Sequence, residues 1–168
     1  MKKLRKDRII FVCLCLFIIL FIFIYLFSNM GKERQYHGDI ETYACTYQQD
    51  DKIYAFDLKG FVYKEKQYVS LNDIYNVMEI IDKNTKVYLD QNRYRMVYKL
   101  SDKTYFFHYR KDLITCNNTS IDVKNYDSHI YISHKNVYIN IFFVEKLLLN
   151  NEKSIKFKNK NAIILKNR

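Results

Sequence analysis

Hydrophobic residues occur with different spacings along the chain. Residues 9–27 form one apolar run without a charged side chain, residues 28–41 are polar, and apolar and polar residues alternate in several later segments. An apolar run of this length forms a helix that crosses a hydrocarbon core of about 30 Å. Alternation with a period of two predicts strands. The predicted strands cover residues 52–58, 85–90, 93–98 and 104–109, with a hairpin turn at 90–92.

Two further segments have the spacing of amphipathic helices. Residues 71–81 repeat apolar side chains every three or four positions, and residues 141–149 do the same. Ser70 precedes the first of these segments as a helix cap, with Asp73 three residues later. The predicted fold class is therefore α+β, with antiparallel strands packed around two helices behind an N-terminal transmembrane helix.

The strand, helix and hairpin pattern occurs twice, in units at about residues 66–98 and 135–166. Ile74 and Met78 align with Phe143 and Leu147, and after a one-residue gap the two hairpins also align, apolar on apolar. One such unit cannot bury its helix face alone, so we expect the two units to share one core.

The N-terminus predicts the location of the protein. Five basic residues and one acid lie within residues 1–8, so this segment should stay in the cytoplasm and the C-terminal domain should be extracytoplasmic. A cleavable signal peptide is the alternative, but residues 25–30 lack the small residues of a cleavage site. The expected order is a cytoplasmic segment (1–8), a single transmembrane helix (9–27), a tether (28–41) and an ectodomain (42–168).

Charge and aromatic content suggest what the ectodomain contacts. The chain carries a net charge of +10, of which residues 1–8 contribute five basic and one acidic side chain, so +6 remains. A basic exported domain fits anionic wall polymers or lipid headgroups and makes nucleic acid an unsuitable partner. Tyrosines beside Lys and Arg suit stacking on sugars or contact with a protein. The candidate contact residues are Arg93, Tyr94, Arg95, Lys153, Lys156, Lys158 and Lys160.

Four cysteines fall into two groups. Cys13 and Cys15 lie in the apolar run and pack as small apolar residues. Cys45 and Cys116 are a candidate disulfide outside the membrane, provided that the fold brings their Cα atoms within about 7 Å. The chain has no CxxC motif and thus no sign of a zinc or redox site.

The duplicated unit resembles the copper amine oxidase N-terminal-like domain, also called the stalk domain, of exported bacterial proteins. The first copy reads YVSLNDIYNVMEII, KVYLD and RMVY, and the second reads VYINIFFVEKLLL, SIKFK and AIIL. The similarity covers about residues 53–166 and lies in pattern, spacing and duplication. The family proline, tryptophan and helix-ending glycine are absent. The resemblance implies a non-catalytic spacer or binding module without copper.

An Asn-Tyr-Asp run at residues 125–127 raises the alternative of a copper–quinone enzyme. Such a run carries the cofactor tyrosine in amine oxidases, whose catalytic domain is much longer than this chain. His129 and His134 do not have the His-x-His spacing of a copper pair, and a strand would point them to opposite faces. Glu79 and Glu145 are expected to be solvated helix residues. We expect no catalytic residues, metal or cofactor.

The expected function is a membrane-anchored, extracytoplasmic binding or spacer module that contacts the cell wall or an envelope protein. The alternative is an accessory or regulatory subunit of an envelope enzyme or signalling protein. Both functions require a binding surface and no catalytic centre.

Overall fold

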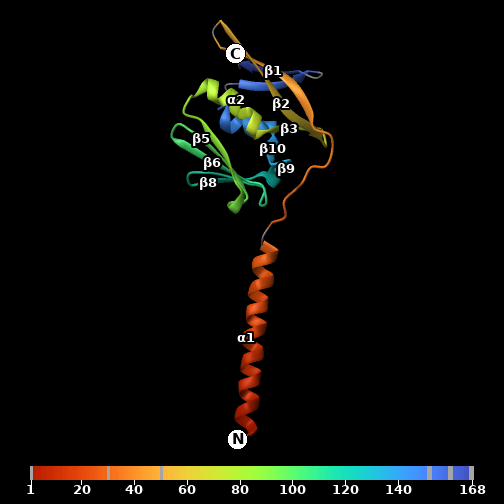
Figure 1. Cartoon of the computed structure of the whole chain (residues 1–168), viewed down its shortest axis with the longest axis vertical. Coiled ribbons are helices and arrows are strands. Elements are labelled where there is room, and N and C mark those ends of the chain that lie inside the picture. The colour runs from red at the N-terminus through yellow and green to blue at the C-terminus, as the bar shows by residue number, and fades with distance from the viewer. Residues whose placement is uncertain (1, 30, 50, 151–152, 159–160, 167–168) are drawn as a thin grey trace. The chain divides into compact units, whose positions relative to one another are not determined.

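The computed structural model describes residues 2–29, 31–49, 51–150, 153–158 and 161–166. The chain divides into two compact units, Met1–Lys32 and Glu33–Arg168. The first unit is a single helix, and the second, called the domain below, is α+β with two sheets (Figure 1).

The helix α1 (Lys2–Asn29) contains the apolar run. Within residues 8–26, an 18-residue stretch has a mean hydropathy of 3.4, so this segment is long and apolar enough to cross a membrane, as an anchor or a signal sequence would be. The helix extends beyond residues 9–27 at both ends because nothing in the flanking sequence breaks it.

The first sheet has seven strands in the order β11–β12–β1–β2–β3–β10–β9. All neighbours are antiparallel except β1 and β12, which are parallel. In the pairing of β3 with β10, Ser70 faces Tyr138 and Val69 faces Ile139. The strands are β1 (Glu41–Gln49), β2 (Lys52–Tyr63), β3 (Lys66–Ser70), β9 (Tyr131–Ser133), β10 (Asn136–Asn140), β11 (Lys153–Lys158) and β12 (Asn161–Lys166).

The second sheet is a five-stranded antiparallel meander in sequence order. It contains the predicted hairpin and the predicted strand near residue 105, followed by two strands that the sequence pattern did not predict. Its strands are β4 (Lys86–Asp90), β5 (Arg95–Leu100), β6 (Lys103–His108), β7 (Leu113–Cys116) and β8 (Thr119–Asp122).

The helix α2 (Leu71–Ile81) joins the two sheets. It has the predicted bounds, and it contacts β2, β3 and β10 of one sheet and β4 of the other. The Ser70 hydroxyl accepts a hydrogen bond from the backbone N–H of Asp73, as the capping pattern predicts. Leu71, Ile74, Val77 and Met78 are buried in a single hydrophobic core that includes residues from both sheets.

The second predicted helix is shorter and irregular. It consists of α3 (Ile141–Phe143) and a π-helical turn, η3 (Val144–Leu148). Asn140 caps it by accepting the Phe142 N–H, and Glu145 accepts the N–H of Ile155, the next strand's buried residue. The prediction of a regular helix over 141–149 is therefore only partly right.

No glycine supplies a positive φ angle among the residues that the structure describes. In the described part of the chain, ten non-glycine residues have positive φ, among them both central residues of the β2–β3 turn (Lys64, Glu65) and of the β9–β10 turn (His134, Lys135). Two consecutive positive φ angles fit the primed turns that hairpins prefer. Lys, Asp and Asn thus supply turns as expected, although His, Glu, Ser and Tyr do so too.

The segment predicted as a tether, 28–41, is partly docked on the domain. Gln35 forms a parallel bridge with Ile132, and Tyr36 N–H and Ile132 N–H donate to Ile132 O and Arg34 O at 3.2 and 2.9 Å. Residues 33–38, called the strap below, therefore extend the β9 edge of the sheet. In Figure 1 the strap is the orange segment that passes β9 before β1.

His108 makes the stability of the domain depend on pH. Partial burial, together with the charges of Arg95 and Lys111, lowers the pKa of the His108 imidazole. Because the folded pKa lies below the unfolded value of about 6.5, the free energy of unfolding should fall as pH drops below that value. His108→Gln should flatten this dependence in unfolding measured between neutral and acidic pH. An unchanged slope would show that other groups cause it.

Candidate functional site

An open groove of about 530 Å³ lies between three segments that are distant in sequence. One wall is the strap, the second is the β4–β5 hairpin together with Tyr109, and the third is the β9–β10 turn. Its lining residues are Glu33, Gln35, Tyr36, His37, Gly38, Leu89, Gln91, Tyr94, Tyr109, Ile132, Ser133, His134 and Lys135.

The strap wall is fixed through an aromatic stack. The ring of Tyr36 lies parallel to that of Phe61, with centroids 3.6 Å apart. Phe61 belongs to a second buried cluster with Tyr68, Tyr131 and Tyr138. Gly38 lies against Tyr36, since a Cβ at Gly38 would be 2.5 Å from the Tyr36 hydroxyl oxygen. These contacts fix the position of the Tyr36 ring in the strap wall.

The buried carboxylate of Asp112 links the strap to the rest of the domain. Asp112 is 2% exposed and has φ of 54°, and its Oδ2 accepts from Arg34 Nε at 3.0 Å. The same oxygen lies 3.0 Å from His129 Nδ1, while Oδ1 accepts the Ile130 N–H at 2.8 Å. Asp112 thus connects the strap, the β6–β7 turn and the segment before β9.

The hairpin wall is built around Tyr94. This residue has φ of 52° where the short helical turn η1 (Gln91–Arg93) ends, and its carbonyl accepts the Tyr109 N–H at 3.2 Å. The Tyr94 and Tyr109 rings meet edge to face at 6.2 Å. The Arg110 guanidinium lies 3.2 Å from the Tyr94 ring centroid and pairs with Glu33 at 3.1 Å. The Glu33–Arg110 pair links the hairpin wall to the strap.

The third wall is the tight β9–β10 turn. The Ser133 hydroxyl and His134 Nδ1 lie 3.0 Å apart, and His134 and Lys135 are exposed. The positive φ of both turn residues directs the backbone sharply back into β10.

The groove offers polar contacts around aromatic surfaces. Burial is the main cause that raises the pKa of the Tyr36 and Tyr109 phenols, with further contributions from acids that include Asp39 for Tyr36 and Glu33 for Tyr109. Both hydroxyls are therefore protonated at neutral pH and can donate hydrogen bonds. Tyrosine rings, two imidazoles, two glutamines, a carboxylate and an ammonium are suited to a ligand that presents hydroxyl groups and apolar ring faces.

The lining contains one hydroxyl–imidazole pair, Ser133 with His134, and among the described residues no third group forms a hydrogen bond that orients the His134 ring. The described residues hold no cluster of three or more His, Cys, Asp or Glu side chains that could bind a metal ion.

No protein-family model, curated protein or solved structure matches the chain. The groove must therefore be interpreted from its own residues.

Of the predicted contact residues whose side chains the structure describes, only Tyr94 lines the groove. Arg93 is exposed at the hairpin tip. Arg95 is engaged within the domain, since its Nε donates to Asp90 at 3.0 Å and its guanidinium lies 4.3 Å from the Phe106 ring. The Arg93–Tyr94–Arg95 run is thus not one contact surface.

The predicted lysines lie elsewhere, on and beside β11. Lys153 Nζ donates to the Tyr47 hydroxyl at 2.7 Å and lies over its ring, while Lys156 is exposed. The Lys158 side chain and Lys160 fall outside the part that the structure describes. Lysines along an edge strand such as β11 discourage pairing with another sheet.

Cys45 and Cys116 are free thiols in the structure and do not form the candidate disulfide. Cys45 is buried in β1 of one sheet, and burial raises its pKa to about 12. Cys116 lies in β7 of the other sheet, opposite Tyr105 in β6. Burial is the main cause that raises the pKa of Tyr105 to about 12, and Cys116 contributes to it. The pair was inferred from count and compartment alone, which do not fix the position of either strand.

The Asn-Tyr-Asp run forms a turn. Tyr126 ends the short helical turn η2 (Val123–Tyr126), and Asp127 follows with positive φ. Lys66 Nζ donates to the Tyr126 carbonyl at 3.0 Å and lies 3.1 Å from Asp127 Oδ2. His129 contacts Asp112, whereas His134 lies in the groove. Tyr126, His129 and His134 therefore lie in three different environments in the structure.

Proposed function

We propose that the chain is a membrane-anchored binding module and that its groove takes a segment of an envelope glycan. The observation that carries this proposal is the groove lining, in which Tyr36, Tyr94 and Tyr109 alternate with imidazole, amide, carboxylate and ammonium groups. Sugars stack their apolar faces on aromatic rings and satisfy their hydroxyls with such polar groups. No catalytic step is part of the proposal.

The orientation is the second element of the proposal. The basic residues before the apolar run favour a cytoplasmic N-terminus, which would put the domain on the outer side of the membrane. There the groove would meet wall polymers and not cytoplasmic ligands. The domain begins four residues after the end of α1, so it would remain close to the membrane surface.

A duplicated stalk-type unit is the third element. β3 and α2 precede one hairpin and β10, α3 and η3 precede another. When the two units are aligned, Ser70 corresponds to Ile139 and Val69 corresponds to Tyr138. The sheet contains both the Ser70–Tyr138 pair and the Val69–Ile139 pair, so the β3–β10 pairing is symmetric between the units and supports the duplication. The hairpins differ, since β4–β5 lies in the five-stranded sheet and β11–β12 in the seven-stranded one.

The binding proposal is tested by co-sedimentation of the detergent-solubilised full chain with purified cell walls over a salt series. His37→Ala and Gln91→Ala remove exposed side chains from opposite walls, so they should leave the fold intact. Each should weaken saturable binding about fivefold or more, corresponding to about 1 kcal/mol for one lost hydrogen bond. Tyr88→Ala removes an exposed tyrosine outside the groove and should bind as the parent does.

The salt series distinguishes the groove from the net charge. Binding through the groove should persist when ionic strength screens surface charge, while binding through lysines alone should vanish. Equal binding by the parent and both groove variants would reject the groove as the site.

A further inference from the structure

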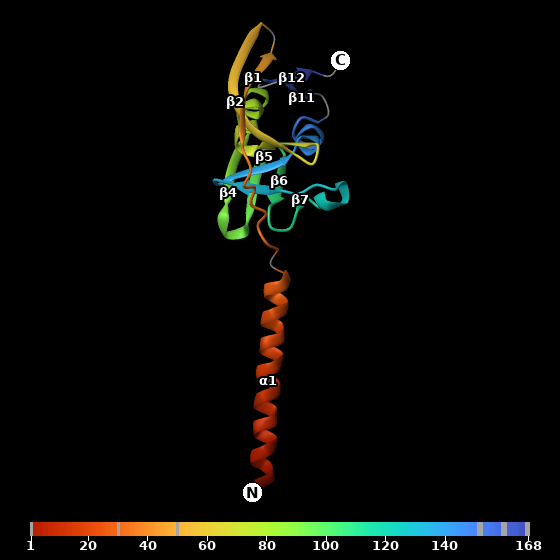
Figure 2. The same cartoon turned by 90° about the vertical axis from the view of Figure 1, so that its right-hand side faces the viewer.

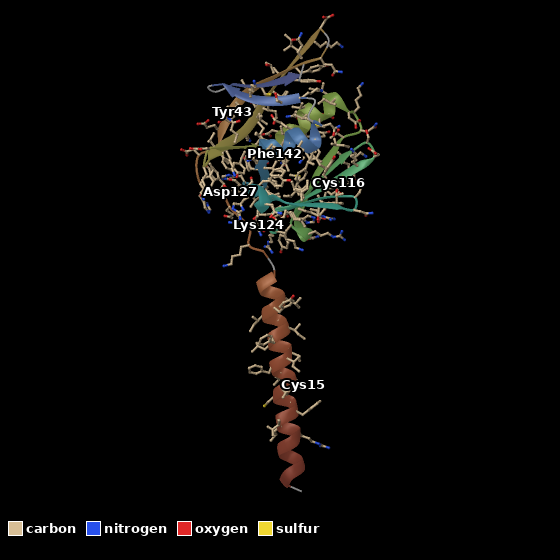
Figure 3. The ribbon with its side chains drawn as sticks, turned by 180° about the vertical axis from the view of Figure 1, so that it is seen from behind. Cys15, Tyr43, Cys116, Lys124, Asp127 and Phe142 are labelled. Carbon is tan, nitrogen blue, oxygen red and sulfur yellow. The ribbon has the colours of Figure 1, made fainter. Side chains whose placement is uncertain are left out.

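The domain carries an exposed aromatic patch that is separate from the groove. It consists of Tyr126 at the end of η2 and Phe142 in α3, which are 44% and 42% exposed, with ring centroids 5.6 Å apart. Figure 2 shows the turn that carries η2, in teal, projecting from the domain, and Figure 3 shows Phe142 with Lys124 and Asp127 from behind.

The patch is packed against the core and its turn is hydrogen-bonded to the domain. Tyr126 also meets the ring of Phe143 edge to face at 5.3 Å, and Phe143 is 1% exposed in the core. Lys66 fixes the backbone of the same turn through the Tyr126 carbonyl. Two neighbouring aromatic side chains are therefore exposed to solvent in a fixed position. Adjacent exposed apolar side chains are typical of a contact surface.

One lysine lies beside both rings, and a second lies in the same turn as Tyr126. Lys146 Nζ lies 5.9 Å from the Tyr126 centroid and 5.5 Å from that of Phe142, and Lys124 lies in η2 itself. Neither ammonium forms an ion pair among the described residues. The nearby carboxylates are engaged in the turn, Asp122 with the Lys124 N–H and Asp127 with Lys66.

We infer that the Tyr126–Phe142 patch docks on an anionic lipid surface. A phenylalanine offers no polar atom to a sugar, whereas aromatic rings beside lysines suit the boundary between anionic headgroups and acyl chains. This inference rests on the proposed membrane anchoring, because the short connection to α1 keeps the domain at high effective concentration over the bilayer. Charge complementarity selects anionic over zwitterionic lipid.

The absence of tryptophan from the sequence allows a direct test in the full chain. Phe142→Trp places a unique tryptophan in the patch, Tyr88→Trp places one at an exposed position on β4, and Phe17→Trp places one in α1. Each variant is reconstituted into vesicles of brominated phosphatidylcholine, with or without brominated phosphatidylglycerol. Quenching of the tryptophan emission reports contact with the acyl region.

The expected result is that Phe142→Trp is quenched in vesicles that contain phosphatidylglycerol and much less in phosphatidylcholine alone, while Tyr88→Trp is quenched in neither. Adding Lys124→Glu and Lys146→Glu should reduce docking, each lysine contributing about a fivefold factor in partition to the anionic surface.

Separate outcomes overturn the inference and the anchoring. Quenching of Phe17→Trp without quenching of Phe142→Trp would keep the anchor and reject lipid docking. Absence of quenching in both would reject the two together. An emission shift of Phe142→Trp on addition of soluble wall glycan, with no response to lipid, would assign the patch to a glycan.

Discussion

Asp112→Ala is expected to lower the free energy of unfolding by about 3 kcal/mol. The substitution leaves the buried N–H of Ile130 without its acceptor and removes the anion that Arg34 and His129 share. It also puts alanine at a φ of 54°, which aspartate tolerates better. The half-exposed Arg34 can be solvated by water when its partner is removed. Most of the lost stability should therefore come from the unsatisfied Ile130 N–H and from the positive φ angle.

The measurement is chemical unfolding of the full chain in micelles, combined with hydrogen exchange. The Ile132 N–H donates to Arg34 O, so its exchange should accelerate when the strap loosens. Asp112→Asn keeps an acceptor for Ile130 and should cost about 1 kcal/mol. Equal stability of the alanine variant and the parent would show that Asp112 does not hold the strap.

Phe107→Ala is expected to cost about 3–5 kcal/mol. Phe107 is fully buried on the central strand β6, between Met96 and Ile114 in the sheet, and its ring meets Tyr98 edge to face at 6.3 Å. Because one core contains residues of both sheets, the loss should lower the stability of both sheets together.

The neighbouring Phe106 provides a matched control. It lies on the same strand, is partly exposed, and contacts the Arg95 guanidinium. Phe106→Ala should therefore cost about 1 kcal/mol, from a cation–π contact and partial burial. Unfolding of the five-stranded sheet alone in Phe107→Ala would contradict a single shared core.

Local patterns predicted the elements whose signal lies in adjacent residues. The helix α2 was found with correct bounds because its apolar spacing and its Ser70 cap agree. The strand β1 was not predicted, although Tyr43, Cys45 and Tyr47 alternate into the core, because tyrosine and cysteine are ambiguous as core residues. η3 was predicted as ordinary helix, because the sequence pattern does not distinguish a π-helical turn.

The groove could not be predicted because three distant segments form it. Tyr94 was a candidate because it is a tyrosine between two arginines. Tyr36, Tyr109 and His134 line the groove with it because Gln35 pairs with Ile132 and Tyr109 with Tyr94, and these pairings have no local sequence signal. The polar segment before β1 suggested a free tether, since its ion pairs to Arg110 and Asp112 have no local signal.

The most direct test of glycan binding in the groove is hydroxyl-radical footprinting of the full chain in nanodiscs, with and without soluble cell-wall glycan fragments. Groove binding predicts reduced oxidation of Tyr36, His37, Tyr94 and His134, with unchanged oxidation of Tyr88 and Tyr126 outside it. Protection of Tyr88 or Tyr126, without protection of any groove residue, would contradict it.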